Sequence, residues 1–311
     1  MNTPDRRIRA TAARGDRDGS RGSGSPCAPV NRLDPRPAVP QSSAVGSAGG
    51  SGRDRLGVSV VIPVKDDGVE LERVLQDLAA QTVAPDEVIV VDNASTEDIA
   101  SIARRAGARV VFEAAPGIPA AASAGYDAAA SPIIARCDAD SRLPRDWIER
   151  IEHRIGRGDV AAVTGPGDFY SDADVERDGR VLRLLSNVYM SSYRWGMHAA
   201  LGNPPLFGSN CAFRADVWRA VRSRVHRTGD DIHDDIDLSV HLGRRHLVAW
   251  DRDLRVGISS RPLDRGARRL RVARGWRSLS LHWPHESPLL RWRRRIKWRG
   301  EFRAEPALRR R

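Results

Sequence analysis

The chain has 311 residues, of which 29% are charged and 41% apolar, and its formal net charge is +11. The length suits one large domain or two small ones, and the composition is typical of a soluble globular protein. There is no apolar run of about 18 residues and no signal-peptide core, so we expect a protein that neither spans a membrane nor is secreted. Its three cysteines are far apart, which argues against a disulfide framework and fits a reduced, cytoplasmic setting.

Charge is distributed unevenly along the chain. Residues 261–311 hold 17 basic and four acidic side chains, whereas acidic side chains outnumber basic ones in 56–260. Residues 1–55 are rich in Gly, Ser, Pro and Arg and show almost no apolar periodicity, which is typical of a disordered leader. We therefore expect a leader at 1–55, a folded domain at 56–260 and a basic tail at 261–311.

The first half of the folded domain alternates between β-branched runs and amphipathic stretches. The pattern predicts strands at 58–64, 87–92, 109–113 and 131–140, and helices at 69–81, 97–106 and 120–130. We expect Ser95 or Thr96 to cap the second of these helices. The order β-α-β-α-β-α-β predicts an α/β fold with a mostly parallel, doubly wound sheet flanked by helices.

The second half is less regular. Helices are predicted at 144–155, 180–193, from 215 onward and at 233–242, with short strands at 160–164, within 207–214, at 247–250 and at 255–258. A mobile loop is expected near Trp195.

Two carboxylates, Asp138 and Asp140, stand where the strand that contains Ile133 and Ile134 should end. In open α/β sheets, ligands bind outside the carboxyl ends of the strands, and residues two apart in extended chain point the same way. Two hard oxygen donors beside a bound phosphate suit Mg²⁺ or Mn²⁺. A D-x-D motif by itself is short and also occurs in solvated loops, so its meaning depends on the neighbouring motifs.

Five segments together resemble family 2 glycosyltransferases with the GT-A (Rossmann-like) fold. They are VSVVIPVKDD, DEVIVVDNAST, IIARCDAD, FGSNCAFRADVW and HDDIDLSVHL, and they follow one another in the family's order and spacing. The resemblance covers about residues 57–260, and several motifs in register are more specific than one. It implies a nucleotide-binding half at 56–145 and an acceptor half at 146–260.

The resemblance also implies a reaction and its participants. The donor would be a UDP-, GDP- or dTDP-linked sugar, the cofactor Mn²⁺ or Mg²⁺, and the acceptor a saccharide or a lipid-linked molecule, with inversion at the anomeric carbon. Cell-envelope polysaccharide or glycolipid synthesis is the family-level expectation. By the same resemblance, Pro63 and Val64 would line the nucleotide pocket, and Asp92 or Asn93 would bind the base. Asp138 would contact the ribose or the metal, and Asp140 the metal and the diphosphate. Asp235 would be the general base, and Asp234 stands where the family commonly has Glu.

Two departures from the family pattern stand out. Many relatives carry Arg-Asn in the helix before the D-x-D strand, the Arg touching the diphosphate, where this chain has Ala122 and Ser123. Arg136 or Arg142 would then have to take that role. The Gln-x-x-Arg-Trp pattern of processive members has only a weak echo at 271–276, so we expect an enzyme that adds one sugar.

Two other functions stay open at this point. A nucleotidyltransferase also combines a doubly wound sheet with paired acids, but 64–70 lacks the Gly-rich loop with Arg and Lys that such enzymes show. A non-catalytic protein that binds sugar nucleotides or polyanions is the other alternative, and the intact acids Asp138, Asp140 and Asp235 argue against it. Cys137 and Cys211 are expected to be packed small residues rather than reactive thiols.

The end of the chain offers two further features. His282 and His285 either add a metal ligand or lie in a surface loop. In the segment 289–299, Leu289, Trp292 and Ile296 share a helical face among arginines, which suits peripheral contact with the inner face of the plasma membrane. The alternative is a partly ordered tail whose aromatics pack on the domain. No nucleic-acid-binding motif is present, so no specific nucleic acid is expected.

Overall fold

The structure is a computed structural model that describes residues 55–170, 179–229, 231–243, 246–259 and 265–297. The described residues belong to one unit, Gly52–Arg311. The predicted leader lies outside the described residues apart from Arg55, as does the end of the predicted tail from 298 onward.

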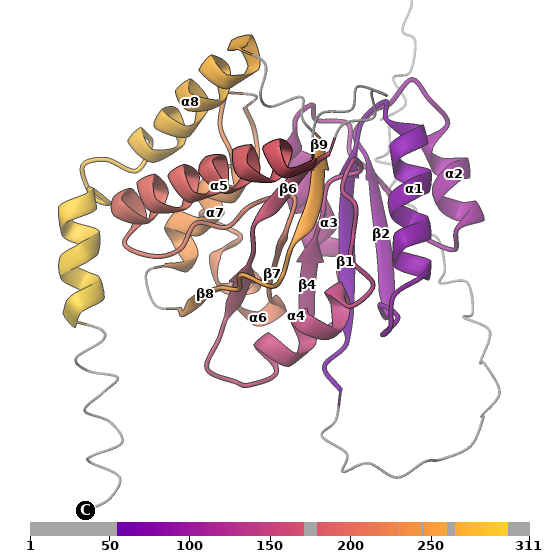
Figure 1. Cartoon of the computed structure of the whole chain (residues 1–311), viewed down its shortest axis with the longest axis horizontal. Coiled ribbons are helices and arrows are strands. Elements are labelled where there is room, and N and C mark those ends of the chain that lie inside the picture. The colour runs from indigo at the N-terminus through magenta and orange to yellow at the C-terminus, as the bar shows by residue number, and fades with distance from the viewer. Residues whose placement is uncertain (1–54, 171–178, 230, 244–245, 260–264, 298–311) are drawn as a thin grey trace, which may run out of the picture. The chain divides into compact units, whose positions relative to one another are not determined.

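A seven-stranded sheet in the order β3-β2-β1-β4-β7-β5-β8 forms the centre of the fold (Figure 1). All neighbouring pairs are parallel except those that involve β7, which runs antiparallel to β4 and β5. A second, two-stranded parallel sheet joins β6 to β9. The mostly parallel α/β architecture is therefore confirmed. The strands are β1 (Val58–Val64), β2 (Glu87–Asp92), β3 (Arg109–Phe112), β4 (Ile133–Arg136), β5 (Ala162–Thr164), β6 (Gly167–Tyr170), β7 (Cys211–Arg214), β8 (Val248–Trp250) and β9 (Val256–Ser259).

Helices cover both faces of the large sheet. Alternate residues of a strand point to opposite faces, so Val60 and Ile62 of β1 pack with α1, α2 and α4, while Val61 packs with α3, α6 and α7. The two apolar layers are buried on either side of one sheet, which fixes the strand ends in space. The helices are α1 (Gly68–Ala79), α2 (Ile99–Arg105), α3 (Ile118–Ala128), α4 (Trp147–Ile155), α5 (Gly179–Leu201), α6 (Ala215–Val221), α7 (Asp234–Leu242) and α8 (Arg265–Ser280).

Helix α3 lies very close to the sheet at Gly125. A Cβ atom at this position would stand 2.3 Å from Cγ1 of Val61 and 2.8 Å from Cγ2 of Val91. The missing side chain therefore lets the α3 backbone lie directly on β1 and β2.

Several local predictions were wrong. The cap of α2 is Asp98, whose side chain accepts a hydrogen bond from the Ser101 N–H, rather than Ser95 or Thr96. The loop expected near Trp195 is helical, because α5 continues to Leu201. Its continuation is stabilised by the Tyr193 hydroxyl, which donates to the Leu206 carbonyl at 2.7 Å.

The segment predicted as a basic tail is helical over α8 and again over 288–297. Buried Arg291 donates to the carbonyls of Leu201 (2.7 Å) and Val240 (3.2 Å), and the Trp292 indole donates to Ala199 O. Leu289 and Ile296 are 80% and 67% exposed. This helix therefore turns Arg291 toward the domain and Leu289 and Ile296 outward. Trp292 packs on the domain, as expected for a partly ordered tail whose aromatic residues contact it.

None of the described helices combines the length and the apolar character that crossing a lipid bilayer requires.

Candidate functional site

The strand order of the sheet reverses between β1 and β4. The strands β2 and β3 follow on one side of β1, and β4 lies on the other, so the order reverses at this pair. In open α/β sheets ligands bind at such a switch point, outside the carboxyl ends of the strands. The segments that follow β1, β2 and β4 all lie at this edge, and they carry the predicted donor residues.

The loops after β1 and β2 are joined by Asp66. Its carboxylate accepts from the Thr96 N–H and hydroxyl at 2.5 and 2.9 Å, and these hydrogen bonds lower the pKa of Asp66. Asp92 accepts from Ser95 N–H at 2.9 Å, which closes the turn after β2. Hydrogen bonds therefore hold the two turns that follow β1 and β2 in place at the carboxyl end of the sheet.

The residues predicted to contact the nucleotide differ in how far they are buried. Pro63 is partly exposed at the end of β1, whereas Val64 is 4% exposed and its side chain lies in the apolar core. Asn93 is also 4% exposed. Its amide donates to the carbonyls of Glu113 and Ala115 and accepts from Gly117 N–H. The Asn93 amide therefore holds the loop after β3, and of the two residues expected at the base, Asp92 is the more exposed.

Asp138 and Asp140 do not share a strand face, because β4 ends at Arg136 and residues 138–141 form a turn, closed by a hydrogen bond from Ser141 N to Asp138 O. The Asp138 carboxylate is 34% exposed and accepts from Arg136 at 3.1 Å and from the Ser209 hydroxyl. Asp140 is half-buried, and its carbonyl accepts from Tyr170. Carboxylate oxygens on one turn are ligands of the type that Mn²⁺ and Mg²⁺ prefer.

Arg136 connects this turn to the acidic end of α7. The side chain is 3% exposed and donates to Asp138, to Asp234 and, at 3.4 Å, to the Tyr126 hydroxyl. Burial works against the charged form, yet Asp234, Tyr126 and Asp138 together raise the pKa of Arg136 well above its usual range. Arg136 therefore stays cationic. An arginine at the end of an apolar strand was the sequence signal for this ion pair, since a buried charge needs a partner.

The two predicted catalytic acids stand in the first turn of α7 in different settings. Burial, opposed by Arg136, raises the pKa of Asp234 to about 6. Asp235 instead accepts from two backbone N–H groups, Gly208 at 2.9 Å and Ile236 at 2.8 Å, which fix its orientation. Both line one cavity together with Arg136 and Asp138.

That cavity has a volume of about 510 Å³. Most of its other lining residues come from α5, α8 and the segment 207–209, with Ile118 of α3 and residues 232–236 completing them. No role was predicted for the residues that α5 and α8 contribute. They include Tyr189, Tyr193, Met197, Arg271, Arg274 and Trp276. In α5 the only sequence signal was apolar and aromatic positions at helical spacing, which a packed core would produce equally well. In α8 it was the weak echo of the Gln-x-x-Arg-Trp pattern at 271–276.

The structure also answers the questions left open for cysteine and histidine. Cys137 and Cys211 are buried, and burial raises the pKa of both thiols, so they are packed residues as expected. His285 is exposed, whereas His282 is 9% exposed and bonds to Asp237.

Arg142, the other arginine considered for the diphosphate, pairs with Glu70 at 2.7 Å and stacks on Tyr170.

Solved structures with the same fold include two glycosyltransferases. A mannosyltransferase from Pyrobaculum calidifontis in complex with GDP-Man and Mn²⁺ is 21% identical, with a TM-score of 0.53, and the match covers 71% of this chain and 61% of that one. Glucosyl-3-phosphoglycerate synthase from Mycobacterium tuberculosis, in complex with Mn²⁺, UDP-Glc and phosphoglyceric acid, is 22% identical, with a TM-score of 0.53 over 72% and 78% of the two chains. At these identities the likeness shows the fold.

Curated relatives are closer in sequence but shorter in match. Uncharacterized glycosyltransferases of Mycobacterium tuberculosis and Mycobacterium bovis are 38% identical over 108 residues, which is 35% of this chain and 47% of theirs. The chain thus spans about half the length of these relatives. The model of the family described as glycosyl transferase family 2 matches residues 59–227, more than half of the chain. This chain belongs to glycosyl transferase family 2.

Proposed function

We propose that the protein transfers one sugar from a nucleotide-diphosphate donor to a hydroxyl acceptor, with inversion and with the help of Mn²⁺ or Mg²⁺. One observation carries this proposal: adjacent residues hold the two carboxylates that such a reaction needs. The Gly208 N–H binds Asp235, and the Ser209 hydroxyl binds Asp138. A donor-side acid and a candidate base are thereby fixed on one cavity wall.

The donor would lie along the edge formed by Pro63, Asp92 and the turn that carries Asp138 and Asp140. Asp140 and Asp138 would hold the metal, which supplies positive charge to the diphosphate as it leaves. Arg136 is buried between two acids and lines the cavity, so it adds a fixed positive charge beside this turn. The solved relatives with GDP-Man and UDP-Glc make GDP and UDP the first nucleotides to test.

Asp235 is the proposed general base. The acceptor oxygen forms a bond to the anomeric carbon, its proton passes to the Asp235 carboxylate, and the bond from that carbon to the diphosphate breaks. A single displacement of this kind inverts the anomeric configuration. Two backbone N–H donors hold Asp235 in place, while Asp234 is engaged by Arg136 and orients that guanidinium.

A thermal-shift panel tests the donor site. UDP, GDP and dTDP and their common sugars are compared with and without Mn²⁺ on the wild type and on Asp140→Asn. Binding to the native state raises the melting temperature by mass action, so we expect a metal-dependent shift with one nucleotide that the variant loses. Binding that survives without metal and in Asp140→Asn would favour the non-catalytic alternative.

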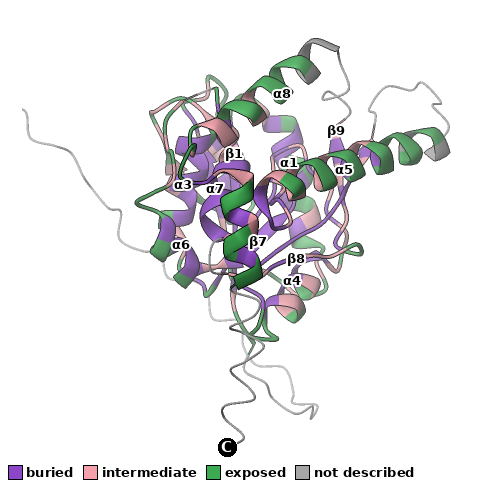
Figure 2. Ribbon diagram, turned by 90° about the vertical axis from the view of Figure 1, so that its left-hand side faces the viewer, coloured by how far each residue is buried: buried purple, intermediate pink, exposed green. Residues whose placement is uncertain are grey.

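For the acceptor we favour a lipid-linked molecule at an anionic membrane surface. Besides lining the cavity, α5 and α8 carry large exposed apolar side chains, among them Leu184, Val188, Leu270, Val272 and Trp276, and Figure 2 shows both helices with long exposed stretches. Leu289 and Ile296 extend this character to 288–297. Apolar side chains among arginines are the composition of surface-bound membrane helices.

Vesicle sedimentation tests this acceptor reading. We expect the wild type to bind phosphatidylglycerol vesicles, and the double variant Leu289→Ser, Ile296→Ser to bind more weakly. The control is Val69→Ser, because Val69 is also 67% exposed but belongs to α1, which packs on one face of the sheet, whereas the helix at 288–297 bonds to α7 on the other face. Equal binding by all three proteins, or none by the wild type, would favour a soluble saccharide acceptor.

A further inference from the structure

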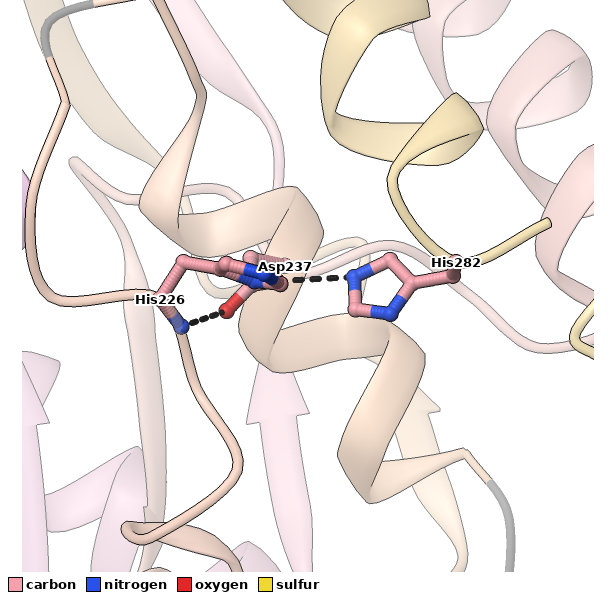
Figure 3. Close-up of side chains that lie close together, drawn as sticks. All are labelled: His226, Asp237 and His282. Atoms are coloured by element: carbon pink, nitrogen blue, oxygen red, sulfur yellow. Dashed lines mark hydrogen bonds and ion pairs between the residues drawn. The ribbon is translucent and has the colours of Figure 1, made fainter.

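Three histidines surround one carboxylate oxygen of Asp237, a residue of α7. The proposed reaction uses none of these four residues. The Nδ1 atom of His226 and the Nε2 atom of His282 each lie 2.8 Å from Oδ1 of Asp237 (Figure 3). The Nε2 atom of His241, one turn further along α7, lies 4.0 Å from the same oxygen. The neighbouring imidazole rings are 5.1 to 5.3 Å apart between centroids.

The carboxylate at the centre is buried and fixed in its orientation. Asp237 is 1% exposed, and its other oxygen accepts from the backbone N–H of His226 at 2.8 Å. A buried carboxylate oxygen flanked by imidazole nitrogens is a pre-positioned set of ligand atoms rather than an ordinary surface ion pair.

We propose that His226, Asp237 and His282 bind a Zn²⁺ ion, with His241 beside them as a further imidazole. The three ligand atoms all lie within 4.8 Å of one another. Zn²⁺ binds imidazole nitrogen and carboxylate oxygen at about 2.0 to 2.2 Å and prefers four-coordinate sites. In a tetrahedron with such bonds the ligand atoms are roughly 3.3 Å apart, so small side-chain movements would accommodate the ion.

The chemistry of the ligands separates this site from the donor site. Mn²⁺ and Mg²⁺ prefer oxygen ligands such as Asp138 and Asp140, whereas imidazole ligands favour Zn²⁺. The His226 side chain is 42% exposed, which leaves an open side for the ion to enter, while Asp237, His241 and His282 are at most 9% exposed. The same chain would therefore carry two metal sites of different selectivity.

The ion would join three segments that are far apart in the sequence. His226 follows α6, Asp237 and His241 belong to α7, and His282 follows α8. The start of α7 carries Asp234 and Asp235, and α8 forms one wall of the cavity. Zn²⁺ at this place would fix α8 against α7 and thereby hold the acceptor side of the cavity in shape.

The test measures metal directly, in the full chain without a histidine tag. After EDTA treatment, Zn²⁺ is added back, bound metal is counted by mass spectrometry, and Co²⁺ replaces Zn²⁺ to report coordination by its visible spectrum. All proteins also carry Asp140→Asn, so that the donor site does not contribute. The variants are His226→Ala and His282→Ala, and the control is His285→Ala, because His285 is exposed in the same turn as His282.

We expect one Zn²⁺ per chain in the parent and in the His285→Ala control, an intense tetrahedral Co²⁺ spectrum, and a rise in melting temperature with Zn²⁺. In His226→Ala and His282→Ala the affinity should fall at least about tenfold and the Zn²⁺-dependent rise should disappear. His226 is partly exposed, so its variant is expected to fold, which circular dichroism checks. The proposal is overturned if the parent binds no stoichiometric Zn²⁺, or if both variants bind it as the parent does.

Discussion

Arg136 and Asp234 form a buried ion pair that ties the carboxyl end of β4 to the first turn of α7. The same guanidinium reaches Asp138 at 3.1 Å. One side chain therefore connects the turn proposed to hold the metal with the turn proposed to hold the base. Because a buried cation that loses its partner is costly, the geometry of both turns depends on this contact.

The first prediction concerns that dependence. Arg136→Met should lower the free energy of unfolding by roughly 3 kcal/mol, because it leaves the buried Asp234 carboxylate without its partner. Asp234→Asn should cost less, because Arg136 keeps its contact with Asp138. The double variant should be less destabilised than the sum of the two, since it leaves no such charge between them. Urea unfolding of the four proteins measures this, and strictly additive losses would show that the pair is not coupled.

The second prediction concerns pH. Burial raises the pKa of Asp234 to about 6, above that of an unfolded chain, so folding favours its protonated form. This contribution to stability is fully present below about pH 4 and is lost as the pH rises through about 6. The stability of the wild type relative to Asp234→Asn should therefore fall over this range, by on the order of 2 kcal/mol. Urea unfolding at several pH values measures the difference, and a constant difference would contradict the prediction.

The third prediction concerns the contact of α3 with the sheet. Gly125→Ala should destabilise the protein by about 1 to 3 kcal/mol, because the new Cβ meets Val61 and Val91 in the core. Gly196→Ala is the matched control: it lies within α5, nothing stands within 4 Å of its Cβ position, and alanine favours helix, so this variant should be slightly more stable. Thermal unfolding of the pair decides, and equal effects would show that α3 can shift away.

The fourth prediction concerns the helix at 288–297. Arg291→Met removes the donors to the Leu201 and Val240 carbonyls and should cost about 2 kcal/mol of stability. Arg293→Met on the exposed side of the same helix should change stability by less than about 0.5 kcal/mol. If both variants unfold at the same urea concentration, the helix does not contribute to the stability of the domain.

Much of the fold was readable from the sequence where one signal dominates. The buried runs at 58–64 and 87–92 predicted β1 and β2 at their observed bounds. The antiparallel β7 and the pairing of β6 with β9 were not predictable, because strand order depends on contacts between distant segments. Trp195 was assigned to a loop for a related reason: α5 is held by contacts such as Tyr193 with Leu206, which local sequence does not reveal.

The candidate site shows the same division. Motifs singled out Asp138, Asp140 and Asp235 as candidates. The expectation that Asp138 and Asp140 point the same way along a strand was wrong, because the chain turns at 138–141. The hydrogen bonds of Asn93 with the loop at 113–117 could not be predicted, because they join segments that lie at least 20 residues apart in the sequence. Arg136 was noticed only as a substitute for a missing arginine, since its two partners lie 2 and 98 positions away.

The most direct test of the proposed reaction is the variant Asp235→Asn. Donor affinity is measured by calorimetry with Mn²⁺, and turnover by the release of nucleoside diphosphate from the donor, with Asp216→Asn as an exposed control. We predict that Asp235→Asn binds the donor within about twofold of the wild type, and that its turnover falls by roughly 10² to 10⁴, the contribution of a general base. Wild-type turnover in Asp235→Asn would contradict the assignment of the base and, with it, the account of the cavity as a glycosyl-transfer site.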